Sequence, residues 1–410
     1  MMRRRHAALL GLALALHAGS ASAASDTAAG SLLVFPLVSV DPGRGVDTEI
    51  RVTNLGDAPQ AVRCAYVDGS LAPGSALGFQ VVLAAGQPTA WLAGEGATLA
   101  LTGGTVPPIP APPFSGALRC VAAEPDGTPT AADVLIGSAA LLRGGAAADS
   151  AAYDAVAFLA TGSSADEPDV LVLGGAQSEY GACPAELALQ PLLDGAVVAL
   201  GADAAVERTA RTTIALATCS SDPVGGASAT IDLRLTNELG QQFTARRALR
   251  EHLVVDLSRL DTGVPSQSIF TSANAGTPSG ALRITPTSPG SAVLAVALTA
   301  LEPASGPAQR AALSPQLLGE RGAPGDLVDL AVPTVTPPPA CPGDCDGDGA
   351  VAINELIVGV NIALGSAALE SCPAFDTDAD GAVAINELIA AVNAALSGCD
   401  SGSRIQDPGN

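Results

Sequence analysis

Two acidic segments near the C-terminus have the residue types and the spacing of a metal-binding loop. Residues 344–355 read DCDGDGAVAINE and residues 376–387 read DTDADGAVAINE, so ten of the twelve positions are identical. Both follow the pattern D-x-D-x-D-G-x-x-x-x-x-E of a calcium loop. Calcium is a hard cation that takes about six to eight oxygen ligands. The duplicated motif therefore predicts two bound Ca2+ ions.

Each loop supplies the oxygens that such a site needs. Positions 1, 3 and 5 are aspartates, position 7 contributes its backbone carbonyl, and the glutamate at position 12 can give two oxygens. The predicted ligands are Asp344, Asp346, Asp348, Ala350 and Glu355 in the first loop, and Asp376, Asp378, Asp380, Ala382 and Glu387 in the second. Because the carboxylates of a metal-free loop repel one another, binding and folding should be coupled. The alternative is an acidic, glycine-rich surface loop without an ion.

A stretch with helical periodicity follows each loop. Apolar residues recur at i, i+4 and i+8, on one face of each predicted helix. They are Leu356, Val360 and Leu364 after the first loop, and Leu388, Val392 and Leu396 after the second. Gly365 and Gly398 stand where helix C-caps are expected. The proline-rich segment before the first loop cannot form a helix. Two loop–helix units are expected, with these apolar faces packed together and Val351 and Val383, at loop position 8, facing the small core.

On these residues, segment 341–399 resembles a type I dockerin, a duplicated loop–helix calcium module carried at the end of secreted proteins behind a Pro/Thr linker. It departs from the family by having Glu at position 12, where dockerins usually have Asp. It also carries four cysteines, Cys341, Cys345, Cys372 and Cys399, which many dockerins lack.

The resemblance implies a protein partner, because dockerins bind cohesin domains. In that family, loop positions 10 and 11 help to set recognition. These positions are Ile353 with Asn354 in the first loop and Ile385 with Asn386 in the second, identical in the two copies. A cohesin-like protein or a cell-surface component is therefore the expected partner.

The N-terminus has the features of a secretory signal peptide. Three arginines at 3–5 precede an apolar core, and the small residues at 21–23 form a cleavage site, which places the leader at 1–23 or 1–24. No later apolar run is long enough to cross a bilayer. The protein is therefore expected outside the cell or on its surface.

Eight cysteines in an exported chain predict disulfides. We expect Cys64 to pair with Cys120 and Cys183 with Cys219. The four cysteines of the module allow three connectivities, and a bridge from Cys341 or Cys345 to Cys399 is favoured because it would tie the module's ends together. The formal net charge of −22, with no lysine, does not suit binding to nucleic acid or to an anionic membrane.

The rest of the chain is predicted to be mainly β. Short strands with turn signals predict two β-sandwich domains, at 25–165 and 166–332, which loosely resemble bacterial immunoglobulin-like domains. The expected strands are 31–40, 47–54, 61–69, 78–86, 116–127, 134–142 and 153–160, then 170–175, 212–219, 229–237, 242–249, 252–257, 280–286 and 292–301. A stiff linker at 333–340 leads to the calcium module at 341–399, and a disordered tail follows at 400–410.

Motifs for catalysis are not found. Outside the leader the sequence has one histidine, His252, on a predicted strand, and it has no phosphate loop and no nucleophile elbow. The sequence thus predicts a secreted, non-enzymatic calcium-binding protein whose dockerin-like module mediates assembly or surface attachment. Two alternatives stay open: a calcium-stabilised structural cap on a β-rich adhesin, and a dockerin-bearing polysaccharide hydrolase.

Overall fold

The chain folds into two compact units, Met1–Val332 and Pro333–Asn410. The computed structural model describes residues 24–25, 28–69, 76–99, 101–102, 104–110, 112–144, 148–161, 169–175, 178–200, 206–219, 228–250, 252–287, 292–304, 306, 308–321, 326–329, 342–345, 351–375 and 383–397. Residues 1–23 of the expected leader, the linker at 333–340 and the tail at 400–410 lie outside these residues, as does the stretch 162–168 around the expected domain boundary.

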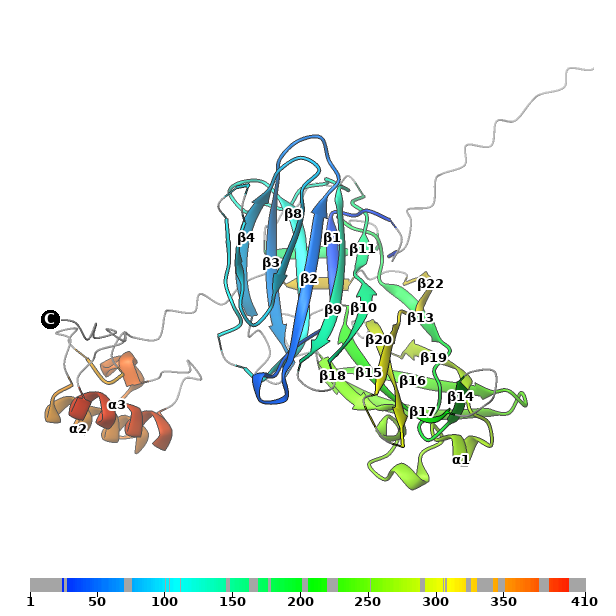
Figure 1. Cartoon of the computed structure of the whole chain (residues 1–410). Coiled ribbons are helices and arrows are strands. Elements are labelled where there is room, and N and C mark those ends of the chain that lie inside the picture. Colours follow the sequence, from blue (N-terminus) through cyan, green and yellow to red (C-terminus); the bar gives the residue numbers. More distant parts are fainter. Residues whose placement is uncertain are drawn as a thin grey trace, which may run out of the picture. The chain divides into compact units, whose positions relative to one another are not determined.

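The first half of the larger unit forms two antiparallel sheets (Figure 1). The five-stranded sheet has the order β11 (Val156–Phe158), β1 (Leu32–Val40), β8 (Phe114–Ala123), β3 (Gln60–Asp68) and β4 (Ala76–Leu83). The four-stranded sheet has the order β10 (Asp149–Asp154), β9 (Leu135–Arg143), β2 (Val46–Asn54) and β5 (Pro88–Leu92).

The second half forms two more large sheets. One has the order β17 (Gln242–Arg250), β16 (Ser228–Asn237), β19 (Gly280–Pro286), β13 (Pro184–Leu189) and β22 (Gln316–Glu320). The other has the order β14 (Val197–Leu200), β15 (Val206–Thr218), β20 (Val293–Pro303) and β21 (Gln309–Leu313), with β18 (His252–Asp256) also paired to β15.

Short elements complete this unit. Two small pairs are β12 (Val170–Leu173) with β23 (Asp326–Asp329) and β6 (Ala97–Thr98) with β7 (Thr105–Val106). The short helices are η1 (Pro42–Arg44), η3 (Leu257–Arg259), η4 (Pro265–Gln267) and α1 (Ser272–Ala275). Among the described residues, no helix is both long enough and apolar enough to span a membrane.

The first two sheets bury a common apolar core. On β2, Ile50 and Val52 point inward, which is the alternation that their sequence pattern predicts. Trp91 lies in this core, and its indole Nε1–H donates a hydrogen bond of 2.7 Å to the hydroxyl of Tyr66. Because that pair is buried, the hydrogen bond satisfies both polar groups at low cost.

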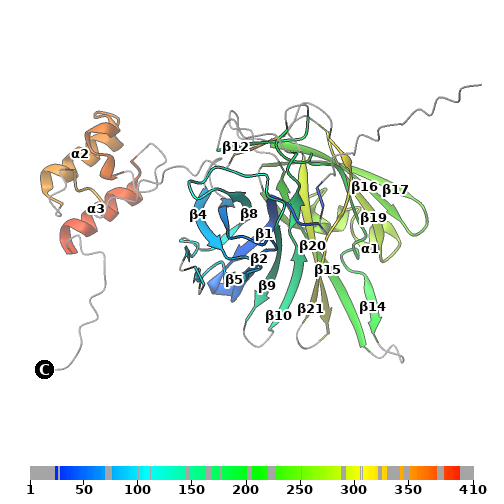
Figure 2. The ribbon, with the colours of Figure 1, turned by 90° about the horizontal axis from the view of Figure 1, so that it is seen from above.

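Strand β1 is buried on both faces, and this joins the two halves. Leu33 and Phe35 belong to the core between the first two sheets, whereas Leu32 and Val34 belong to a second cluster with Leu294 of β20. Figure 2 shows β1 near β20 and β10 beside β21, in agreement with contacts between these strands.

The mainly β class is confirmed, but the expectation of two sandwich domains is wrong. The sheets lie in a propeller-like arrangement within one compact unit. The physical reason is the shared burial: Ala215 and Val296 of the second half complete the core of the first half.

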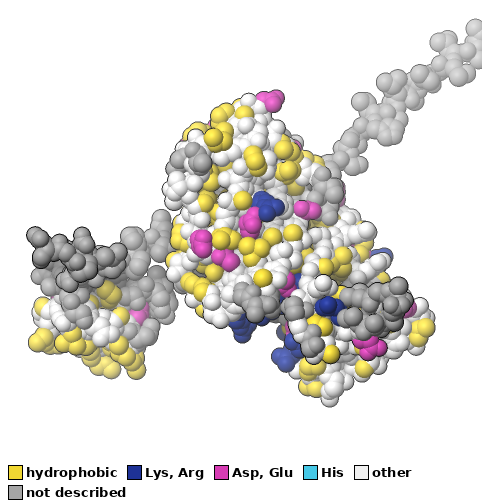
Figure 3. All heavy atoms as spheres, viewed as in Figure 1, with side chains coloured by type: hydrophobic (Ala, Val, Ile, Leu, Met, Phe, Trp, Pro, Cys, Tyr) yellow, Lys and Arg dark blue, Asp and Glu magenta, His cyan; other side chains and the backbone are white. Residues whose placement is uncertain are grey.

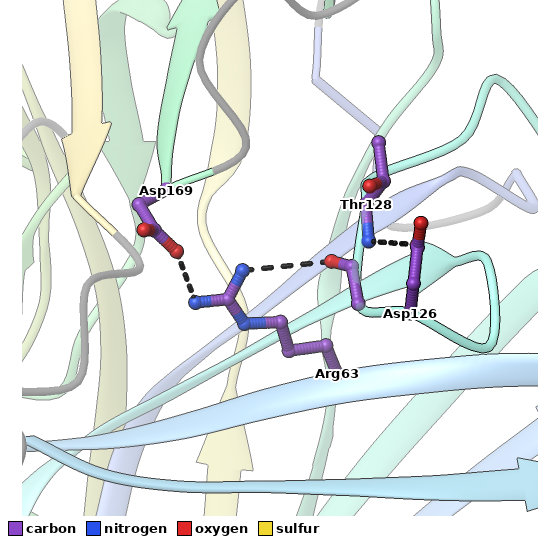
Figure 4. A network of polar contacts seen from close by, with 5 residues as sticks. Arg63, Asp126, Thr128 and Asp169 are labelled. Carbon is purple, nitrogen blue, oxygen red and sulfur yellow. Dashed lines mark hydrogen bonds and ion pairs between the residues drawn. The ribbon is translucent and has the colours of Figure 1, made fainter.

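Polar contacts also tie the halves together. Arg310 forms an ion pair of 2.8 Å with Asp149. Arg63 forms an ion pair with Asp169 and donates a 3.5 Å hydrogen bond to the carbonyl of Gly127 (Figure 4). Asp126, in the same turn, accepts a hydrogen bond from the backbone of Thr128. The Asp126–Gly127 pair is therefore a turn that contacts Arg63, and Arg63 forms the link to Asp169 in the second half.

Two predicted disulfides are confirmed. Cys64 and Cys120 are bonded and lie directly opposite each other on β3 and β8. Cys183 and Cys219 are bonded in the cluster that joins the two halves. Both bonds restrict the unfolded chain, which stabilises the β unit.

His252, in the second half, forms a further contact with the first half. Its protonation makes the stability of the β unit depend on pH. Its Nε2 lies 3.0 Å from the carbonyl oxygen of Pro36, so the Nε2–H tautomer donates this bond. Burial lowers the pKa of His252 to about 4, and the bond to Pro36 and the charge of Asp68 only partly oppose this. The unfolded chain therefore binds more protons than the folded chain between the ordinary histidine pKa and this lowered one.

We expect the β unit to lose about 3 kcal/mol of stability through His252 as the pH falls from about 6.5 to 4, and no more below that. The His252→Gln variant should lack this component, because its amide can still donate to Pro36 but does not titrate. Urea unfolding followed by the fluorescence of Trp91 at pH 7 and pH 4.5 measures the difference. Equal pH dependence in both proteins would contradict the prediction.

Candidate metal centre

The smaller unit contains two helices at the positions expected from the duplicated motif. Helix α2 is Ile353–Ala363 and helix α3 is Ile385–Ser397, and the short turns η5 (Leu369–Ser371) and η6 (Pro373–Phe375) lie between them. Gly365 ends the first helix with a positive φ of 69°, as its predicted C-cap role requires. The counterpart Gly398 lies outside the described residues.

The core of this unit is built around one aromatic ring. Phe375 is buried with Ile362, Cys372, Val383 and Ala391. Val351 is buried as well, so both valines at loop position 8 face inward, as predicted.

The expected packing of the helices is wrong. Leu356 and Leu388 contact the core, but Val360, Leu364, Val392 and Leu396 are exposed. The buried side of α2 instead carries Gly359, whose missing side chain makes room for the ring of Phe375. The buried face of α2, which contains Glu355, Gly359 and Ile362, is therefore rotated about the helix axis relative to the predicted apolar face.

The two position-12 glutamates are buried at the starts of the helices. Glu355 is 4% exposed, and its two carboxylate oxygens accept hydrogen bonds of 2.7 Å from the backbone N–H groups of Cys345 and Ala352. Glu387 is 1% exposed and accepts a 2.8 Å bond from the backbone N–H of Ala384. Each glutamate thus binds the free N–H at the first turn of its own helix, where negative charge is stabilised.

These buried charges fit a cation. Segment 341–399 contains no arginine, lysine or histidine, so no basic side chain within it can balance them. Backbone N–H groups offset part of the desolvation cost of a buried carboxylate, and a hard cation would offset the rest. Glu355 and Glu387, together with Asp344 at the start of the first loop, are the described residues that could hold calcium.

The other predicted ligands lie outside the described residues. These are Asp346, Asp348, Ala350, Asp376, Asp378, Asp380 and Ala382. Within the described part of the chain, no three acidic, histidine or cysteine side chains are grouped so that they could hold a metal ion. The two-ion site therefore remains a prediction from the sequence.

The module's disulfide corrects one sequence expectation. Cys345 is bonded to Cys372, so the expected alternative of Cys345 with Cys399 is wrong. The other alternative involves Cys341 and Cys399, which lie outside the described residues. The observed bond links loop position 2 to the buried core, because Cys372 is fully buried.

Sequence reasoning missed two exposed apolar stripes on the helices. They consist of Ile353, Ile357, Val360 and Leu364 on α2, and Ile385, Ile389, Val392 and Leu396 on α3. Figure 3 shows apolar side chains gathered over these helices. The sequence does contain this pattern, because in both repeats the four apolar residues are separated by four, three and four positions. Residues with this spacing lie on one face of a helix.

In the larger unit, His252 has a structural role, because its ring nitrogen forms a hydrogen bond with the carbonyl oxygen of Pro36 on another strand.

A scan against protein-family models found no match for the chain, and a search of the curated proteins found no similar sequence.

Proposed function

We propose that the smaller unit is a calcium-dependent, dockerin-like docking module of a secreted, non-enzymatic protein. The observation that carries this proposal is the pair of exposed apolar stripes. Its partner is a cohesin-like protein or a cell-surface component that covers them. The β unit is the body that this module attaches.

The stripes leave large apolar side chains in contact with solvent. Ile353 and Ile385 are 77% and 75% exposed, and Leu396 is 80% exposed. Burying one such side chain is worth about 1.5–3 kcal/mol. Contiguous apolar patches of this kind mark interaction sites. Ile353 and Ile385 are also the recognition positions that the resemblance implies.

The partner surface should be apolar and uncharged at its centre. The only charged residue of α2 is Glu355 and that of α3 is Glu387, and both are buried. The exposed sides of the helices therefore carry no charge. Recognition by these faces should depend little on ionic strength, because screening acts on charge pairs.

Calcium would contribute positive charge to the carboxylates at the helix starts. The chain's own glutamates then hold the first turns of α2 and α3 through the N–H groups of Ala352 and Ala384. Because the stripes begin at these first turns, loss of the metal should disorder the docking surface. Docking and calcium binding are thereby coupled.

The Ile357→Asp and Ile389→Asp double variant tests the docking surface. We expect it to lose at least tenfold in partner capture, because two charges would be buried at the interface. The full-length protein is immobilised in calcium, exposed to the secreted proteins of its source, and the captured proteins are identified by mass spectrometry. The wild type is measured with and without chelator.

The matched control is Asn361→Asp with Asn393→Asp, which adds the same charges at exposed positions of the same helices. It should capture the partner as the wild type does, and helical circular dichroism should be normal in both variants. Capture that survives chelator and the stripe substitutions would refute docking by this surface. No calcium-dependent capture at all would favour the structural cap.

A further inference from the structure

The disulfide of the smaller unit breaks the symmetry of its two repeats. At the repeat offset, Cys345 corresponds to Thr377 and Cys372 corresponds to Ala340. Neither cysteine thus has a counterpart that could form an equivalent bond. The two loops have the same predicted ligands, yet only the first carries a covalent attachment at position 2.

The attached residue is also a hydrogen-bond partner of the first glutamate. The backbone N–H of Cys345 donates a 2.7 Å bond to Oε1 of Glu355. Residue 345 is therefore fixed in two ways, by its backbone to the glutamate and by its sulfur to Cys372.

The other end of the disulfide is anchored in the core. Cys372 is fully buried beside Phe375 and Ile362. Its backbone N–H donates a 3.0 Å bond to the carbonyl of Leu369, and its carbonyl accepts a 3.3 Å bond from Phe375. The bond therefore ties the first loop to the buried core of the unit.

We infer that the Cys345–Cys372 disulfide positions Glu355 and makes the two calcium sites unequal, with the first site binding more tightly. This inference rests on the proposed calcium-binding function. A ligand that is already held in place loses less conformational entropy when the metal binds, so its affinity is higher. Position 2 of the second loop is Thr377, which cannot form such a covalent attachment.

The test compares each site alone, with and without the disulfide. Glu387→Gln leaves the first site and Glu355→Gln leaves the second. In each background, Cys345→Thr with Cys372→Ala replaces both cysteines by the residues found in the other repeat. Calcium affinity of the full-length proteins is measured by isothermal titration calorimetry.

We expect removal of the disulfide to weaken the first site at least tenfold and the second site less than twofold. Equal losses at both sites, or no loss at the first, would overturn the inference while leaving calcium binding intact. If neither site of the unaltered protein binds calcium, the proposed function itself fails.

A second measurement does not depend on the variants folding. In the unaltered, calcium-loaded protein, the amide of Cys345 should exchange with solvent at least tenfold more slowly than the amide of Thr377. Equal exchange of the two amides would contradict the positioning role of the disulfide.

Discussion

The Glu355→Gln and Glu387→Gln double variant is expected to lose calcium-dependent helix formation in the smaller unit. Both carboxylate oxygens of Glu355 accept hydrogen bonds, from the backbone N–H groups of Cys345 and Ala352. A glutamine has one acceptor oxygen, so one of these two backbone N–H groups would face its amide nitrogen and lose its partner. Each such unpaired group costs about 1–3 kcal/mol. The variant also loses the position-12 ligand of each predicted site.

Circular dichroism at 222 nm with and without chelator measures this effect. Chelator should remove the helical signal of the wild type, and the double variant should lack that signal even in excess calcium. The fluorescence of Trp91 should not change, because the single tryptophan lies in the β unit. A helical signal that is indifferent to chelator would refute calcium-coupled folding.

Charge-preserving substitutions provide the control. Glu355→Asp with Glu387→Asp keeps both negative charges and both acceptor oxygens but shortens the side chain. These proteins should form helices at higher calcium concentrations than the wild type. Complete loss in the aspartate variant would show that reach, and not charge, decides the outcome.

The second large effect is expected at Gly359. A Cβ at this position would overlap the ring of Phe375, and Gly343, the repeat counterpart of Phe375, also borders that ring. One aromatic side chain fills the centre between the repeats, so glycine is required opposite it. We expect Gly359→Val to destabilise the smaller unit by about 3 kcal/mol through overpacking.

Thermal unfolding at 222 nm in saturating calcium measures the change. Ala363→Val is the matched control, because it places the same β-branched residue at an exposed position of the same helix. It should cost well under 1 kcal/mol. Adding Phe375→Leu should relieve part of the Gly359→Val effect, which a double-mutant cycle would detect. Similar losses in the Gly359→Val and Ala363→Val proteins would rule out the overlap with Phe375.

The strands were predictable where side chains alternate or where an apolar run is bounded by turn residues. Strand β2 and strand β16 show clean alternation, and both occur within a residue of their predicted ranges. By contrast, β13, β14, β21, β22 and β23 were missed. These strands are short and lie at or near sheet edges, where partly exposed positions weaken the pattern.

The sequences of β1 and β20 also indicated that these strands are buried between other layers of the structure. Their residues are apolar nearly throughout, which is typical of strands buried on both faces. Two separate sandwiches would leave one face of each sheet in water. The shared clusters of the two halves explain these runs and the single compact unit.

The sequence alone determined the predicted calcium ligands, the two helices that follow the loops, and the two disulfides of the β unit. The ligands and helices depend on residue spacing within short segments. The two disulfides follow because each half of the β unit contains only two cysteines. The tertiary structure decided which side of each helix is buried. Outside their buried glutamates both helices are uncharged, so no polar face marks the exterior, and the ring of Phe375 selects the side that carries Gly359. The tertiary structure also joined Cys345 to Cys372, because that pairing depends on where the chain returns to the core.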